Sequence, residues 1–321
     1  MLSDKLLIMT ITQLQYVMAV AEYRNFTLAA EKSFVTQPTL SMQVQKLEDE
    51  LDILIFDRSK KPIALTDAGK RVIEQARNII NEADRIKDIV AQEKGFIGGD
   101  FKIGIIPTIM PTILPMFLKT FINKYPQVNL EIREQPTETL IRNLKEGNID
   151  AGIAATPLEV DYIKERTLYF EPFVGYVPEG HRLSDKIKLQ RDDLDINDML
   201  LLEDGHCFRD GVINLCKTRR LKSGTPFDIY SGSFETLISL SDEGMGMTLL
   251  PYLNSLHFKN GKSHRIKSFE NPPPAREVSL IYHKNELKIQ IIDALHEVIT
   301  SVIKGAIAFE DVEIVSPLRS A

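Results

Sequence analysis

Hydrophobic positions near the N-terminus recur at helical spacing and predict three short helices. The apolar stripe of the first helix falls on Leu14, Val17, Val20 and Ala21. Thr27 is a candidate N-cap for a second helix over residues 28–32, and Thr36 for a third helix that begins at Gln37. Positions i, i+4, i+7 and i+11 give the inner face of this third helix as Leu40, Val44, Leu47 and Leu51.

The outer face of the third helix is polar but uncharged, because Gln37, Ser41 and Gln45 align there. Glutamine can form a paired hydrogen bond with adenine, and serine can both donate and accept, so this face suits a DNA major groove. A polar face taken alone is more often solvated surface. The turn between two short helices and the basic loop Arg58-Ser59-Lys60-Lys61 together favour DNA binding.

Residues 67–94 predict one long helix, which begins at Thr66 and Asp67. Its apolar positions alternate steps of four and three residues, on Val72, Ala76, Ile79, Ala83, Ile86 and Val90. Such a seam either packs on the chain's own core or forms a dimer contact. Its regularity between two domains favours dimerisation.

Beyond residue 98 the pattern alternates between strands and helices. The expected order is strand 101–106, helix 111–125, strand 128–134, helix 138–146 and strand 151–155. This βαβαβ order predicts a parallel sheet. Later strands are predicted at 173–177, 199–203, 247–250 and 278–282, with a helix at 234–242. Ligands of open sheets bind beyond the carboxyl ends of strands, where Thr108 and Thr137 fall, although each is alone more typical of a helix cap.

Composition narrows the class of protein. Hydrophobic residues make up 43% of the chain and charged residues 26%, which is typical of globular proteins, and no apolar run is long enough to span a membrane. Residues 1–8 hold too short an apolar run for a secretory signal, so we expect a cytoplasmic protein. The net charge of −6 argues against general adhesion to nucleic acid, so any DNA contact must be local.

The only two cysteines, Cys207 and Cys216, lie nine positions apart. A disulfide needs Cα atoms roughly 4.4 to 6.8 Å apart, whereas nine helical residues span about 13 Å. Bridging therefore requires a turn or a refolded segment. The neighbours His206 and Arg209 can stabilise a thiolate. Two buried, unreactive thiols are the alternative, and neither a C-x-x-C pair nor a paired-histidine spacing supports a metal site.

Several blocks resemble the N-terminal signature of LysR-type transcriptional regulators, namely residues 26–30, 35–41, 45–48, 54–58 and 65–69. The resemblance implies a winged helix-turn-helix over residues 9–66. Its third helix would read the major groove, and a wing from Arg58 to Leu65 would contact phosphates. The DNA-binding residues so implied are Thr36, Gln37, Pro38, Thr39, Ser41, Gln45, Lys46, Arg58, Lys60 and Lys61.

The same resemblance implies a dimerisation helix over 67–94 and a regulatory domain over 98–310. The regulatory domain would have two α/β subdomains like those of periplasmic binding proteins. Subdomain I would hold residues 98–156 and 276–310, subdomain II residues 157–275, with crossovers near Thr156 and residues 271–274. The expected fold class is therefore α/β with an all-α DNA-binding head.

Residues 202–216, with the motifs at 103–108, 235–237, 246–251 and 274–276, resemble the hydrogen-peroxide-sensing members of that family. This resemblance implies that Cys207 is the peroxidatic cysteine and Cys216 the resolving one. It places around the peroxide Thr108, Thr137, His206, Arg209, Asp210 and Arg276. Gly211 weakens the helix after Cys207 by about 1 kcal/mol relative to alanine, so oxidation is expected to remodel residues 205–220.

The expected function is thus a redox-responsive transcription factor for oxidative-stress genes, not an enzyme, with no cofactor or metal. Its expected partners are promoter DNA, hydrogen peroxide, RNA polymerase, a cellular thiol reductant and further copies of itself in a homodimer or homotetramer. Two alternatives stay open. The first is a LysR-type regulator with a small-molecule co-inducer in the cleft, and the second is a thiol peroxidase.

Overall fold

The computed structural model describes residues 9–93, 97–216, 231–256, 258, 262–307 and 311–317. The predictions for residues 1–8 and for the segment 217–220 lie outside this range. The chain divides into two compact units, residues 1–94 and residues 95–321. In the described part of the chain, every helix is too short or too polar to cross a membrane.

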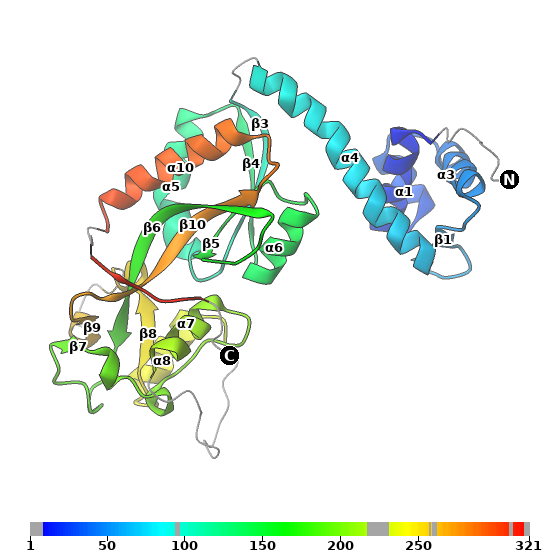
Figure 1. The fold of residues 1–321 in the computed structure, drawn as a ribbon. Helices are drawn as coiled ribbons and strands as arrows, with labels where there is room; N and C mark the ends of the chain where they lie inside the picture. The colour runs from blue at the N-terminus through cyan, green and yellow to red at the C-terminus, as the bar shows by residue number, and fades with distance from the viewer. Residues whose placement is uncertain are drawn as a thin grey trace. The chain divides into compact units, whose positions relative to one another are not determined.

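The first unit is a three-helix head with a wing, followed by a long helix (Figure 1). Its elements are α1 (Ile11–Tyr23), α2 (Phe26–Lys32), α3 (Gln37–Leu51), the antiparallel pair β1 (Phe56–Asp57) and β2 (Ala64–Leu65), and α4 (Asp67–Glu93). Thr36 caps α3 as predicted. Thr27 does not cap α2. Asn25 does, because its side chain accepts from the backbone of Thr27 and Leu28 at 2.8 and 3.1 Å.

The core of this unit gathers the predicted inner face of α3 and part of the seam of α4. Leu40, Val44 and Leu47 are fully buried, while Leu51 is half-buried. On α4, Ala76 is buried, and Val72 and Ile79 pack against the same core. The first half of the seam therefore packs inside its own unit. Further along α4, Ile86 and Val90 are exposed, and their predicted dimer contact stays a prediction.

The second unit begins with the predicted parallel sheet. Strands β4 (Val128–Glu134) and β5 (Ala151–Thr156) both pair in parallel with β3 (Gly99–Ile105) between them. The connecting helices are α5 (Met110–Lys124) and α6 (Thr137–Lys145). The sheet continues through β10 (Pro274–His283), which is antiparallel to β5 and leads into α10 (Ile289–Lys304).

Two long strands, β6 (Ile163–Tyr176) and β10, run side by side from the first core of this unit to a second core (Figure 1). Along β6, Tyr169 belongs to the first core and Phe173 to the second, so the chain crosses between cores later than Thr156. The second core is built from β7 (Lys188–Leu189), α7 (Cys207–Leu215), α8 (Phe234–Asp242), β8 (Thr248–Pro251) and β9 (Ile266–Phe269). Short elements complete the unit: 3-10 turns at Arg191–Asp193, Ile196–Asp198 and Ser263–Arg265, α9 (Tyr252–Ser255) and β11 (Glu313–Ile314).

The strand predicted at residues 199–203 is wrong. Only Met199 forms a bridge, to Met247, and the Leu200 amide donates to the Met247 carbonyl at 2.7 Å. Beyond Leu200 the segment leaves the sheet, and the Leu202 carbonyl accepts from the Arg209 side chain at 2.7 Å.

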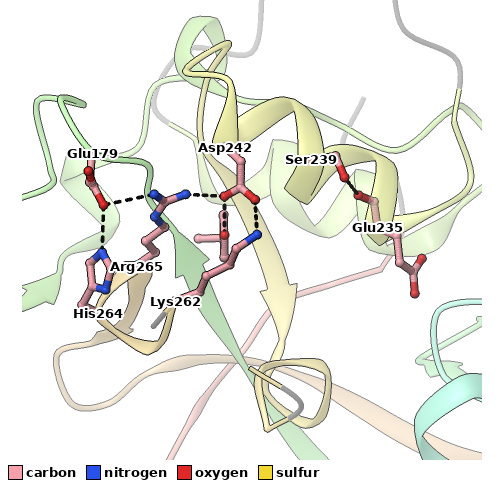
Figure 2. A network of polar contacts seen from close by, with 8 residues as sticks. Glu179, Glu235, Ser239, Asp242, Lys262, His264 and Arg265 are labelled. Atoms are coloured by element: carbon pink, nitrogen blue, oxygen red, sulfur yellow. Dashed lines mark hydrogen bonds and ion pairs between the residues drawn. The ribbon is translucent and has the colours of Figure 1, made fainter. Parts of the chain in front are cut away.

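A polar network fastens the end of α8 to the strands of the second core (Figure 2). The Asp242 carboxylate accepts from the Tyr176 hydroxyl, Lys262 and Arg265. Arg265 also pairs with Glu179 at 3.0 Å. The last turn of α8 is thereby tied to β6 and to the 3-10 turn that precedes β9.

Candidate functional site

The two cysteines occupy opposite ends of one helix. Cys207 is the first residue of α7 and Cys216 is its C-cap, and both thiols are free. Nine helical steps separate their Cα atoms by about 13 Å, roughly twice what a disulfide allows. A disulfide between them therefore requires that α7 unwind.

Cys207 lies where the two cores of the second unit meet. Its side chain packs against the first core, whereas the next residue, Phe208, is buried in the second. The Thr137 hydroxyl, at the start of α6, hydrogen-bonds to the Cys207 thiol. The Cys207 side chain thus contacts the first core, while its own helix packs in the second core through Phe208.

Burial raises the pKa of the Cys207 thiol above its ordinary value. The Arg276 guanidinium and the Thr137 hydrogen bond act in the opposite direction, and the Asp210 carboxylate raises the pKa further. Because the thiolate is the nucleophile, reactivity depends on how far Arg276 and Thr137 offset burial.

We expect the reaction of Cys207 with peroxide to accelerate with pH. A raised pKa means that the thiolate is a minor species near neutrality, so its population should rise about tenfold per pH unit between pH 6 and 8. The measurement is the rate of sulfenate formation in a Cys216→Ser variant across that range. A rate that levels off below pH 7 would show instead that the thiol pKa is lowered.

Arg276 is the most heavily bonded cation near Cys207. It is 3% exposed, and its guanidinium donates to the Thr108 hydroxyl at 2.9 Å and to the Thr108 carbonyl at 3.0 Å. Two further bonds, at 2.7 and 3.0 Å, reach the Glu171 carboxylate, which is 1% exposed. The guanidinium also lies 5.2 Å from the centre of the Phe208 ring. The structure thus brings together Thr108, Thr137, Arg276 and Cys207.

Glu171 was missed by the sequence analysis. The sequence does mark Glu171 as unusual, because it is the single acid in the otherwise apolar run 168–176. A charge in a buried strand needs a partner, and Arg276 supplies it.

Two predicted pocket residues, His206 and Arg209, support the loop before α7. The His206 ring lies 3.7 Å from the Glu203 carboxylate, and Arg209 lies 2.9 Å from Asp204. Together with the bond from Arg209 to the Leu202 carbonyl, these contacts hold residues 202–206 against the helix. A direct contact of either side chain with peroxide stays a prediction.

Cys216 is unreactive where it lies. It is buried in the second core, and burial raises the pKa of its thiol to about 12, with a further contribution from the Asp195 carboxylate. The resolving role assigned to it therefore requires that Cys216 leave this environment.

On the head, most predicted DNA-binding residues of α3 are accessible. The exposed residues are Thr36, Gln37, Pro38, Thr39, Gln45 and Lys46, while Ser41 is half-buried. Phe34, in the turn before α3, is 96% exposed with a backbone φ of 55°, a left-handed conformation that is uncommon for a bulky residue. Phe34 was not among the residues predicted to bind DNA.

The wing loop joins β1 to β2 and carries Arg58, Lys60 and Lys61, all exposed. Arg58 is also structural, since its guanidinium pairs with Glu48 at 2.8 Å. Glu48 in turn accepts from the backbone amides of residues 55 and 56. Arg58 therefore fixes the wing to α3. Lys60 lies 3.7 Å from the Asp57 carboxylate.

Two family models match the chain. Residues 11–70 match the "Bacterial regulatory helix-turn-helix protein, lysR family" and residues 94–304 match the "LysR substrate binding domain". The protein belongs to the LysR family of DNA-binding transcription regulators.

Within that family the chain is similar to peroxide-responsive regulators. It is 30% identical to the "Hydrogen peroxide-inducible genes activator" of Haemophilus influenzae, covering 92% of this chain and 99% of that one. It is 31% identical to the "DNA-binding transcriptional dual regulator OxyR" of Escherichia coli, covering 85% and 89%.

Solved structures agree with these relatives. A full-length, cysteine-substituted OxyR from Pseudomonas aeruginosa superposes with a TM-score of 0.73 at 31% identity, covering 91% of this chain and 98% of that one. A cysteine-to-serine OxyR from Corynebacterium glutamicum with hydrogen peroxide bound gives 0.63 at 26% identity, covering 97% and 98%.

Proposed function

We propose that this protein is a transcription activator that senses hydrogen peroxide through Cys207 and Cys216. The observation that carries the proposal is the position of Cys207: a thiol held between two cores, bonded by Thr137 and close to the buried Arg276. The likeness to peroxide-inducible activators supports it along nearly the whole chain.

The chemistry balances in two steps. The Cys207 thiolate attacks one peroxide oxygen, the O–O bond breaks, and the leaving hydroxide takes a proton to become water, leaving a sulfenic acid. The Cys216 sulfur then attacks the Cys207 sulfur, and a second water leaves as the disulfide forms. Two thiols are oxidised and one peroxide is reduced to two waters. Thr137 and Arg276 stabilise the thiolate, and Thr108 orients Arg276.

The second step couples disulfide formation to a change in the structure of α7. Closing a gap of about 13 Å unwinds α7, whose middle residue Gly211 costs about 1 kcal/mol relative to alanine in a helix. The refolded segment would then change packing between regulatory domains and the spacing of paired heads.

The remaining partners follow from the same proposal. The head binds promoter DNA through α3 and the wing, and Ile86 and Val90 contribute to a homodimer that assembles into a homotetramer in the cytoplasm. RNA polymerase responds to the altered arrangement of the heads on DNA, and a cellular thiol reductant converts the disulfide back to two thiols. The protein is not an enzyme, because one oxidation produces one lasting switch.

The test is a promoter footprint of reduced and peroxide-oxidised protein, combined with a mass-spectrometric map of Cys207 and Cys216. The expected result is an altered footprint that appears together with the disulfide. An unchanged footprint, or oxidised protein without sulfenate or disulfide at these residues, would reject the proposal.

A further inference from the structure

The C-terminal segment returns from α10 to the helix that carries both cysteines (Figure 1). Strand β11 pairs in parallel with the first residues of β10, and the Val315 amide donates to the Ala275 carbonyl at 2.8 Å. Ala275 directly precedes Arg276 in the chain. The segment therefore lies on the strand that supplies the cation near Cys207.

The same segment contacts the far end of α7. The Asn214 side-chain amide donates to the Ser316 carbonyl at 3.1 Å. Val315 is buried in the second core with Val212 and Leu215 of α7. These contacts fall on the last turn of the helix, next to Cys216.

Arg191 links the C-terminal segment to α7 by a third set of contacts. Its guanidinium donates to the Glu313 carboxylate at 2.8 Å and to the Asn214 carbonyl at 2.9 Å. Carbonyls in the last turn of a helix lack intrahelical donors, and a cation is favoured there. Arg191 thus supplies both a hydrogen bond and a charge to the C-terminal end of α7.

We propose that Arg191 and residues 313–316 form a latch that holds the Cys216 end of α7 in its helical form. They are positioning residues, because they act on Cys216 through Asn214 and the apolar residues of α7 that pack with Val315. The latch sets the rate of disulfide closure, and it rests on the redox function proposed above.

The latch acts on one step of the reaction only. Cys216 cannot approach Cys207 while the last turn of α7 is intact. Unwinding that turn breaks the bond that Arg191 donates to the Asn214 carbonyl and the bond that the Asn214 side chain donates to the Ser316 carbonyl. Cys207 lies at the other end of the helix, where Thr137 and Arg276 set its reactivity. Weakening the latch should therefore accelerate disulfide formation and leave sulfenate formation unchanged.

The two steps can be timed separately in the full chain. Sulfenate formation is measured in a Cys216→Ser background by trapping with dimedone, and disulfide closure is measured in the parent chain by acid quenching and peptide mapping. Arg191→Ala removes the two hydrogen bonds of Arg191, of which only the one to the Asn214 carbonyl ends on α7. Loss of that bond should accelerate closure about fivefold, the usual effect of one net hydrogen bond. Glu313→Gln keeps the shape of β11 and should give a smaller acceleration.

A matched control is Arg166→Ala, which removes an arginine that pairs with Asp293 on α10, away from α7. It should leave both rates unchanged. Hydrogen exchange in reduced protein provides a second readout, since Arg191→Ala should expose the amides of residues 214–216 to faster exchange.

The outcomes separate the latch from the redox function. If the parent chain forms its disulfide but Arg191→Ala closes at the parent rate, the latch is wrong and the redox function stands. If Arg191→Ala accelerates both steps equally, Arg191 acts on Cys207 and the latch is also wrong. If the parent chain forms no sulfenate at Cys207, the redox function fails and the latch fails with it.

Discussion

Replacing Cys207 by serine is expected to abolish the peroxide response while leaving DNA binding intact. A serine hydroxyl is not ionised near neutral pH and cannot attack the peroxide O–O bond, so neither sulfenate nor disulfide can form. The head is a separate compact unit with its own core, so the substitution should not disturb α3 or the wing. The measurement is promoter footprinting with and without peroxide. The variant should give the reduced pattern in both conditions.

The matched control is Cys216→Ser. It should still form a sulfenate at Cys207 but no internal disulfide, which separates loss of the nucleophile from loss of the resolving thiol. An inducible response that survives in Cys207→Ser would favour a regulator with a metabolite co-inducer. Many peroxide turnovers per chain in the presence of a thiol reductant would favour a peroxidase.

Local signals in the sequence predicted the elements well. The periodicity of α3 and its Thr36 cap gave the helix its correct start, and the βαβαβ order gave a parallel sheet. The strand order within that sheet, β4–β3–β5, came from the structure alone. These features depend on neighbours in the chain, which the sequence displays directly. The cap of α2 was misplaced because Asn25 and Thr27 are both good N-caps, and only the backbone geometry distinguishes them.

The seam of α4 shows where periodicity alone is insufficient. Val72, Ala76 and Ile79 share one spacing with Ile86 and Val90, yet the first three pack on the head and the last two are exposed. A period identifies an apolar face, but it does not identify the surface that covers it.

The candidate site was predictable in part. Its cysteines and Arg276 stand in recognisable motifs, whereas Glu171 and Arg191 lie far from them in sequence and reach the site only through the fold. The long strand β6 brings Glu171 beside Arg276, and the return of the C-terminal segment brings Glu313 beside Arg191. Such pairings depend on contacts between distant segments that no local pattern records.

Replacing Glu171 by glutamine is expected to destabilise the second unit and, at the same time, make Cys207 more reactive. The carboxylate neutralises Arg276 in a buried setting, and removing one partner of a buried pair leaves an uncompensated charge at a cost of about 3 kcal/mol or more. The same uncompensated guanidinium should stabilise a nearby thiolate more strongly, which lowers the pKa of Cys207.

The loss of stability and the gain in Cys207 reactivity are measured separately. Urea unfolding of the second unit should shift to a lower midpoint, while alkylation of Cys207 in native buffer should reach half its maximal rate at a lower pH than in the parent chain. The matched control is Glu277→Gln on the neighbouring strand, where the Glu277 carboxylate accepts from the Thr167 hydroxyl at 2.6 Å near the surface. This substitution should lower the free energy of unfolding by about 1 kcal/mol at most and leave the pH profile of Cys207 alkylation unchanged. A Glu171→Gln variant that is destabilised but has an unchanged alkylation profile would show that Arg276 does not control the Cys207 thiolate. The charge near the sulfur would then have to come from the N-terminal end of α7, which Cys207 itself begins.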